Sequence, residues 1–126
     1  MSKRWYRLTV MFGALLASAA HADNFSSAHY DARTDELVVT LFYRGTNPNH
    51  TFQVQWGECQ KLGRNGRQIA GDVLDNQWND AALRDYRITV RFKLTTLTCR
   101  PARVTLRTAP RFFYTVYIPA ASRGPT

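Results

Sequence analysis

Residues 86–94 read YRITVRFKL, and this stretch decides what kind of fold the chain forms. Its residues alternate without exception between two sets: apolar Tyr86, Ile88, Val90, Phe92 and Leu94, and polar Arg87, Thr89, Arg91 and Lys93. Successive side chains of a β-strand point to opposite faces, so the pattern predicts a strand with one apolar and one cationic face. The rest of the chain has to cover the apolar face, and the cationic face has to contact solvent or a negatively charged group.

Most of the remaining sequence also has strand patterns. Further strands are predicted over residues 25–30, 36–44, 51–56, 68–74, 102–108 and 111–118, with Gly71 marking a bulge or a close approach. The one expected exception is a helical turn over residues 81–84, capped by Asn79 or Asp80 and pinned to the body by Trp78 and Leu83. Short links favour antiparallel pairing. The sequence therefore predicts an all-β fold, a small antiparallel β-sandwich of six to seven strands, with a small barrel as the alternative.

The first 22 residues have the layout of a secretory signal peptide. Lys3, Arg4 and Arg7 precede an apolar run over residues 8–16, and Ala20-His21-Ala22 forms an A-x-A cleavage site. A retained membrane anchor is the alternative, but a spanning helix needs about 20 apolar residues. We therefore expect an exported protein, periplasmic or extracellular, with a single domain over residues 23–119 and a flexible tail over residues 120–126.

The chain has two cysteines, Cys59 and Cys99. In an exported protein an even pair predicts a disulfide, and only one pairing exists. The predicted domain resembles an immunoglobulin-like sandwich in its architecture alone, because Trp56 comes before Cys59 instead of well after it. The bridge is accordingly expected to tie a loop to a strand end, at one end of the sandwich.

The charge of the chain is unevenly distributed. The chain has 17 Lys and Arg against nine Asp and Glu, a formal net charge of +8. Loss of the leader removes three bases and no acid, leaving a net charge of +5. Residues 23–85 hold all nine acids and six bases, whereas residues 86–126 hold eight bases and no acid. This asymmetry indicates an anionic partner or surface, pairing between the two halves, or the solubility of an arginine-rich chain.

A hairpin of residues 86–94 with residues 102–108 would place the basic side chains of both strands on one face. The candidate anion-binding residues are Arg87, Thr89, Arg91, Lys93, Arg103, Thr105 and Arg107. Like charges directly opposite each other are destabilising, so carboxylates of the first half or an outside anion should balance them. The outside anion would be a glycan, lipopolysaccharide or an anionic lipid, and export makes nucleic acid unlikely. An ordinary solvated face is the remaining alternative.

Catalysis has little support in the sequence. His29 beside Ser26 and Ser27 does not make a triad, and His50 is expected to be a solvated loop residue. The acids Asp72, Asp75, Asp80 and Asp85 lack the spacing of a glycosidase pair or a calcium loop, and no metal or cofactor site is expected. We therefore expect a non-enzymatic binding module. The alternative is a protein–protein interaction module, a secreted inhibitor or assembly subunit, with Phe113, Tyr117 and loops near Cys59 at its contact.

Overall fold

A computed structural model of the protein describes residues 22–64, 66–108 and 113–121. The predicted signal peptide, apart from Ala22, lies outside these residues, as do residues 122–126 of the predicted tail. The described residues form eight strands and no helix: β1 (Ala22–Asp31), β2 (Glu36–Gly45), β3 (Phe52–Trp56), β4 (Gln60–Leu62), β5 (Gly66–Asp75), β6 (Arg84–Lys93), β7 (Ala102–Arg107) and β8 (Phe113–Ile118).

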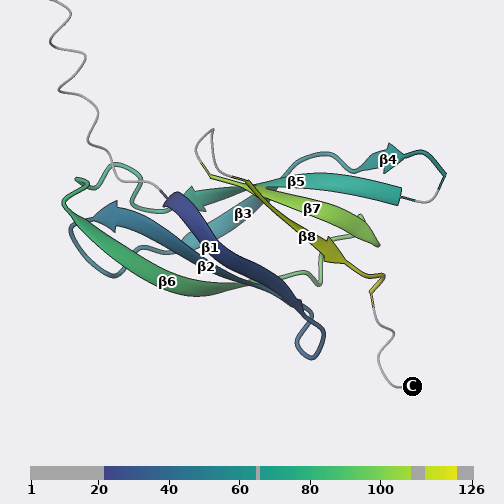
Figure 1. The fold of residues 1–126 in the computed structure, drawn as a ribbon, viewed down its shortest axis with the longest axis horizontal. Coiled ribbons are helices and arrows are strands. Elements are labelled where there is room, and N and C mark those ends of the chain that lie inside the picture. The colour runs from purple at the N-terminus through teal and green to yellow at the C-terminus, as the bar shows by residue number, and fades with distance from the viewer. Residues whose placement is uncertain (1–21, 65, 109–112, 122–126) are drawn as a thin grey trace, which may run out of the picture.

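The strands form two sheets packed face to face, which confirms the predicted all-β sandwich (Figure 1). One sheet has three strands in the order β1-β2-β6, and the other has β3-β5-β7-β8, with β4 pairing along part of β5. The short strand β4 was not predicted, because its residues lie in a glycine-containing stretch that resembles a loop.

The predicted pairing of β6 with β7 is wrong. Strand β6 pairs with β2 over residues 84–93, whereas β7 pairs with β5 and β8 in the other sheet. The link from Leu94 to Pro101 is too long for a tight hairpin turn, and it carries the chain from one sheet to the other. The described strands pair in the antiparallel manner expected, except for β5 and β7, which are parallel. A parallel pair needs a long crossover, and β6 in the facing sheet is part of it.

The core lies between the sheets and follows the predicted alternation. On β2, residues 37–41 are all buried: Leu37, Val39 and Leu41 belong to the core, whereas Val38 and Thr40 lie on the outer face between β1 and β6. The β7 residues predicted to point inward, Ala102, Val104 and Leu106, are almost inaccessible. At one edge Phe25 of β1 meets Tyr114 of β8 edge-on, with ring centroids 6.3 Å apart. Phe92 and Leu94 of the opening stretch are buried in the same core.

The predicted disulfide is present. Cys59 in the β3–β4 link is bonded to Cys99 in the β6–β7 link, with their Cα atoms 5.6 Å apart. It does not join the centres of the two sheets, as expected, but it connects two links and not a loop with a strand end. Among the described residues no helix is long and apolar enough to cross a membrane.

The helical turn predicted over residues 81–84 does not form, and β6 begins at Arg84. Asp80 does not cap the residues that follow it, because its carboxylate accepts hydrogen bonds from the backbone amide and hydroxyl of Thr46. The predicted anchors are wrong as well, since Trp78 and Leu83 are 65% and 70% exposed. Polar contacts across two loops therefore hold this link, in place of apolar anchors.

Candidate functional site

The basic side chains of β6 lie on the outer face of the three-stranded sheet, and three of the four outward residues have partners within the protein. Arg91 Nη1 donates to Asp31 Oδ2 and to Glu36 Oε1, both at 3.0 Å. The Arg91 guanidinium lowers the pKa of Asp31, as expected for an ion pair. The positive charge of Arg91 is therefore already balanced by carboxylates of the protein itself.

Two further candidates on β6, Arg87 and Thr89, contact uncharged residues of β2. The Arg87 guanidinium lies 5.9 Å from the centroid of the Phe42 ring. The hydroxyls of Thr89 and Thr40 are 2.7 Å apart and hydrogen-bonded. Lys93 is exposed opposite Glu36. None of these four side chains faces a candidate from β7.

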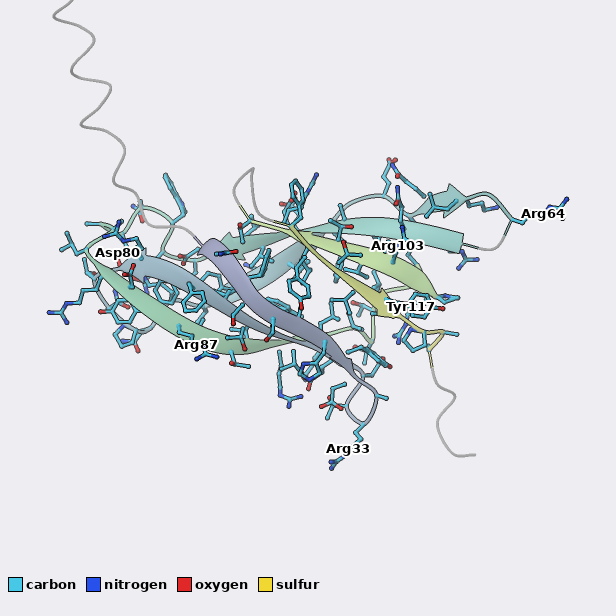
Figure 2. All side chains as sticks on the ribbon, in the orientation of Figure 1. Arg33, Arg64, Asp80, Arg87, Arg103 and Tyr117 are labelled. Carbon is cyan, nitrogen blue, oxygen red and sulfur yellow. A yellow bond between two sulfur atoms is a disulfide. The ribbon has the colours of Figure 1, made fainter. Side chains whose placement is uncertain are left out.

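The candidates on β7 lie on the outer face of the other sheet. In Figure 2, Arg87 and Arg103 lie on opposite layers of the molecule. Arg107 donates from Nε to Asp72 Oδ1 at 2.8 Å and from Nη2 to Asp72 Oδ2 at 3.2 Å. Arg103 is exposed between Gln68 of β5 and Tyr117 of β8. The structure therefore does not bring the seven predicted residues together on one face.

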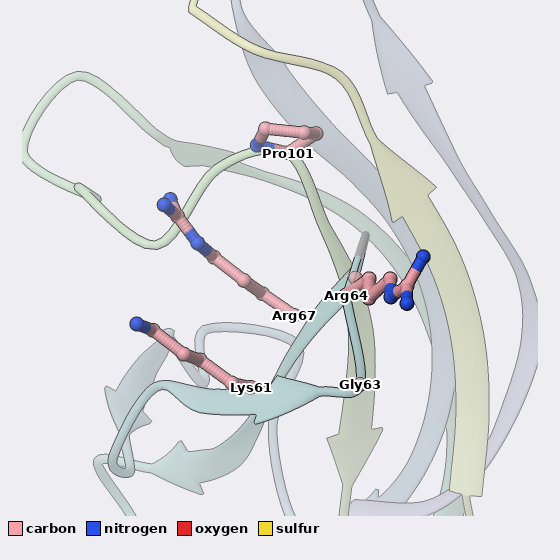
Figure 3. Close-up of a pocket in the computed structure, with 6 residues that line it drawn as sticks. Lys61, Gly63, Arg64, Arg67 and Pro101 are labelled. Carbon is pink, nitrogen blue, oxygen red and sulfur yellow. The ribbon is translucent and has the colours of Figure 1, made fainter.

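Cationic side chains meet instead at the β4–β5 hairpin. Lys61 of β4 and Arg67 of β5 are directly opposite each other in the antiparallel register. With Arg64 from the turn, they line a hollow of about 370 Å³ that also borders Pro101. Figure 3 shows Lys61 and Arg67 extending toward the same side, whereas Arg64 leaves the turn in the other direction. We call Lys61, Arg64 and Arg67, with the glycines between them, the cationic hollow.

The charges of the cationic hollow are not balanced by acids. Its described lining residues include three cations and no carboxylate. Arg67 donates to the backbone carbonyl of Arg100 at 2.8 Å, which orients the guanidinium along the β6–β7 link. Cross-strand like charges destabilise a hairpin, so Lys61 opposite Arg67 favours the binding of an anion. Like charges were expected to face each other across β6 and β7, and they do so across β4 and β5 instead.

The sequence contains a signal for the cationic hollow that strand alternation alone does not reveal. The stretch KLGRNGR places a base at every third position from residue 61, with Gly63 and Gly66 between the bases. Gly63 has a positive φ of 61°, which glycine adopts without strain, and this closes the short hairpin. Basic residues on both sides of such a turn converge when the strands pair.

The aromatic candidates are where the alternation of the last strand predicts. Phe113 and Tyr117 on the outer face of β8 are 60% and 65% exposed. Arg103 lies opposite Tyr117, and the two are labelled beside each other in Figure 2. The loop at Cys59 lies beyond β5 and β7 on the same sheet, so the two parts of the predicted contact are separated by two strands.

The expectation that His50 is a solvated loop residue is wrong. Its side chain is fully buried and stacks on Tyr43, with ring centroids 4.3 Å apart. His50 Nδ1 lies 2.7 Å from Asp75 Oδ2, and Nε2 lies 2.8 Å from Asp80 Oδ2. Ionised carboxylates only accept hydrogen bonds, so both ring nitrogens donate and the ring is an imidazolium. We call Asp75, His50 and Asp80 the buried clasp.

The buried clasp joins the β2–β3 loop to the β5–β6 link. Burial alone disfavours the imidazolium, but hydrogen bonds to Asp75 and Asp80 outweigh it, so the pKa of His50 is raised. Hydrogen bonds from Thr46, and then from His50, lower the pKa of Asp80 to about 2. Among the described residues, no group of three or more His, Cys, Asp or Glu has the arrangement of a metal site. The clasp is a structural element of this end of the sandwich.

Comparison of the chain with protein-family models, curated proteins and solved structures found no match.

Proposed function

We propose that the protein is a non-enzymatic, exported binding module for an anionic ligand or surface, and that the cationic hollow is its site. The observation that carries this proposal is the pair of like charges, Lys61 and Arg67, facing each other with no carboxylate among the described residues that line the hollow. The leader-like N-terminus and the disulfide favour an oxidising compartment, the periplasm or the exterior.

The chemistry of the hollow favours phosphate or sulfate groups over an apolar ligand. Lys61 and Arg67 extend to the same side of the hairpin and can hold a multivalent oxyanion between them, and Arg64 adds positive charge at the turn. The ligand classes are an acidic glycan, the phosphates of lipopolysaccharide or an anionic lipid headgroup. Because Arg91 and Arg107 are already paired with carboxylates, their charges are less available to an anionic ligand.

The test is retention on a heparin column at low salt. The variant Lys61→Glu with Arg64→Glu should elute at much lower salt than the parent, because the affinity for a polyanion depends on the number of cationic contacts. Both side chains are exposed, so the melting temperature should remain nearly unchanged.

The matched control is Arg33→Glu with Arg87→Glu, which changes the net charge by the same amount at exposed positions elsewhere. The control should still elute near the parent. Equal loss in both double variants would show that heparin responds to overall charge, and it would overturn the assignment to the cationic hollow. A selective loss in the control would place the site on the β6 face instead.

A further inference from the structure

A second hollow lies on the outer face of the five-stranded sheet, on the other side of β5 from its buried residues. It measures about 370 Å³ and is bordered by Glu58, Gln60, Gln68, Ala70, Thr105 and Arg107. Strand alternation places Gln68 and Ala70 outward, whereas Ile69 and Val73 point into the core. Ala70 is the small outward residue between Gln68 and Asp72, and it leaves space above the sheet. We call this feature the amide hollow.

The walls of the amide hollow are fixed by hydrogen bonds. Gln68 Nε2 donates to Gln60 Oε1 at 2.9 Å, which holds the two amides side by side across β4 and β5. The backbone amide of Gly57 donates to the carbonyl of Ala70 at 2.8 Å, which holds the link before β4 against β5. Arg107 is kept in place by Asp72. The polar groups are therefore positioned before any ligand arrives.

The amide hollow lies in line with the exposed aromatic residues. The strand register places Gln60, Gln68, Arg103 and Tyr117 in one row across β4, β5, β7 and β8. A second row runs from Asp72 through Arg107 to Phe113. With strands about 4.8 Å apart, the first row is about 14 Å long from β4 to β8. An extended ligand lying across the strands would contact the two amides, then Arg103, and then the Tyr117 ring.

The composition of this face identifies the class of ligand. The lining of the amide hollow includes one acid, Glu58, and one base, Arg107, so its charges balance, in contrast to the cationic hollow. Its other polar groups are amides and a hydroxyl, which both donate and accept hydrogen bonds. A sugar has hydroxyls around its rim and C–H groups on its faces, which suit amides and an exposed aromatic ring respectively.

We propose that this face binds a neutral polysaccharide, with one sugar in the amide hollow and a further sugar of the same chain against Tyr117. A protein partner fits less well. Phe113 and Tyr117 are four residues apart on β8, about 13 Å along the strand, so they do not form the single apolar centre that a stable protein interface needs. The site is distinct from the cationic hollow and does not depend on the proposed anion binding.

The test measures binding of the parent to dextran, laminarin, galactomannan and xyloglucan by affinity electrophoresis and calorimetry. At least one of these neutral polymers should bind, and added salt should not weaken the binding, because no counterions are released. Tyr117→Ala should weaken it about tenfold, the effect of losing one well-placed aromatic contact. Gln68→Ala should weaken it too, and Tyr117→Phe should restore most of it.

The controls separate this site from the rest of the surface. Trp78→Ala removes an aromatic side chain of equal exposure on the β5–β6 link and should leave polysaccharide binding unchanged. Lys61→Glu with Arg64→Glu should also leave it unchanged, even though it abolishes heparin retention. The proposal is overturned if none of the four polymers binds, or if Tyr117→Ala and Gln68→Ala bind as the parent does. It is also overturned if the parent self-associates and Tyr117→Ala abolishes this association.

Discussion

At the scale of single residues, His50 has the most constrained environment of the described histidines. A full positive charge is buried between two carboxylates and stacked on an aromatic ring. Removing one partner from such a group leaves an uncompensated buried charge, which typically costs about 3–5 kcal/mol. Gly45 makes the arrangement possible, because a Cβ there would lie 2.8 Å from both the His50 ring and the Asp80 carboxylate.

The buried clasp predicts a bell-shaped dependence of stability on pH. The folded-state pKa of His50 is raised above its unfolded value of about 6.5, so its contribution is complete below that pH and is lost as the pH rises through the folded-state pKa. The pKa of Asp80, about 2, is below its unfolded value, so its contribution is lost as the pH falls toward that value. The melting temperature should therefore be highest between roughly pH 4 and pH 6.5.

Calorimetry across this pH range checks the prediction. His50→Gln should lower the melting temperature and remove most of the decline on the alkaline side. His29→Gln, at an exposed position on β1, should leave the profile of the parent intact. If His50→Gln is too unstable to measure, NMR titration of the parent's imidazole signals gives the same answer. A His50 ring that loses its proton at or below its ordinary pKa would refute the prediction.

At the scale of elements, β5 is constrained by the close approach predicted at Gly71. A Cβ at this position would lie 2.6 Å from Val54 Cγ1 and 2.9 Å from Trp56 Cζ3, both on β3. Overpacking of this kind costs about 1–3 kcal/mol, so Gly71→Ala should lower the free energy of unfolding by that amount. Gly66→Ala on the same strand meets only ordinary contacts at 3.5 Å and is the matched control. Equal urea midpoints for the two variants would contradict the structural reading of β5.

Strand positions could be predicted from the sequence because each strand carries its own periodicity. The alternation in residues 86–94 and 102–108 correctly separates inward from outward residues on β6 and β7. Pairing could not be predicted in the same way, because an alternating strand fits any partner that covers its apolar face. The length of the link at residues 94–101 was the available signal that β6 and β7 do not form a hairpin.

At the scale of the whole molecule, the disulfide is a long-range constraint on a small domain. Cys59 and Cys99 are 40 residues apart, and in the chain-entropy model a loop of this length contributes about 4 kcal/mol. Small domains have only about 5–15 kcal/mol of net stability. Cys59→Ser with Cys99→Ser should thus lose roughly 4 kcal/mol in urea unfolding. Reduction of the parent should cause a similar loss, and a variant as stable as the oxidised parent would disprove this role.

The sequence predicted which types of residue form the candidate sites but not where in the fold they meet. The excess of bases and the exposed aromatics of β8 were visible in the sequence, and the aromatics lie where they were expected. The partners of each arginine were not visible, because Asp31 and Arg91 are 60 residues apart and become neighbours only through the order of the strands. The same holds for His50, because Asp75 at the end of β5 and Asp80 in the β5–β6 link are 25 and 30 residues away from it.

The parallel pairing of β5 with β7 constrains the order in which the strands assemble during folding. Strand β7 docks beside β5 only after the chain has crossed to the opposite layer and returned, and β8 then covers the outer edge of β7. A growing polypeptide that ends before Ala102 lacks the buried Val104 and Leu106, so the larger sheet stays incomplete until the last fifth of the chain has been synthesised. These late, long-range pairings are therefore expected to limit the rate at which the sandwich forms.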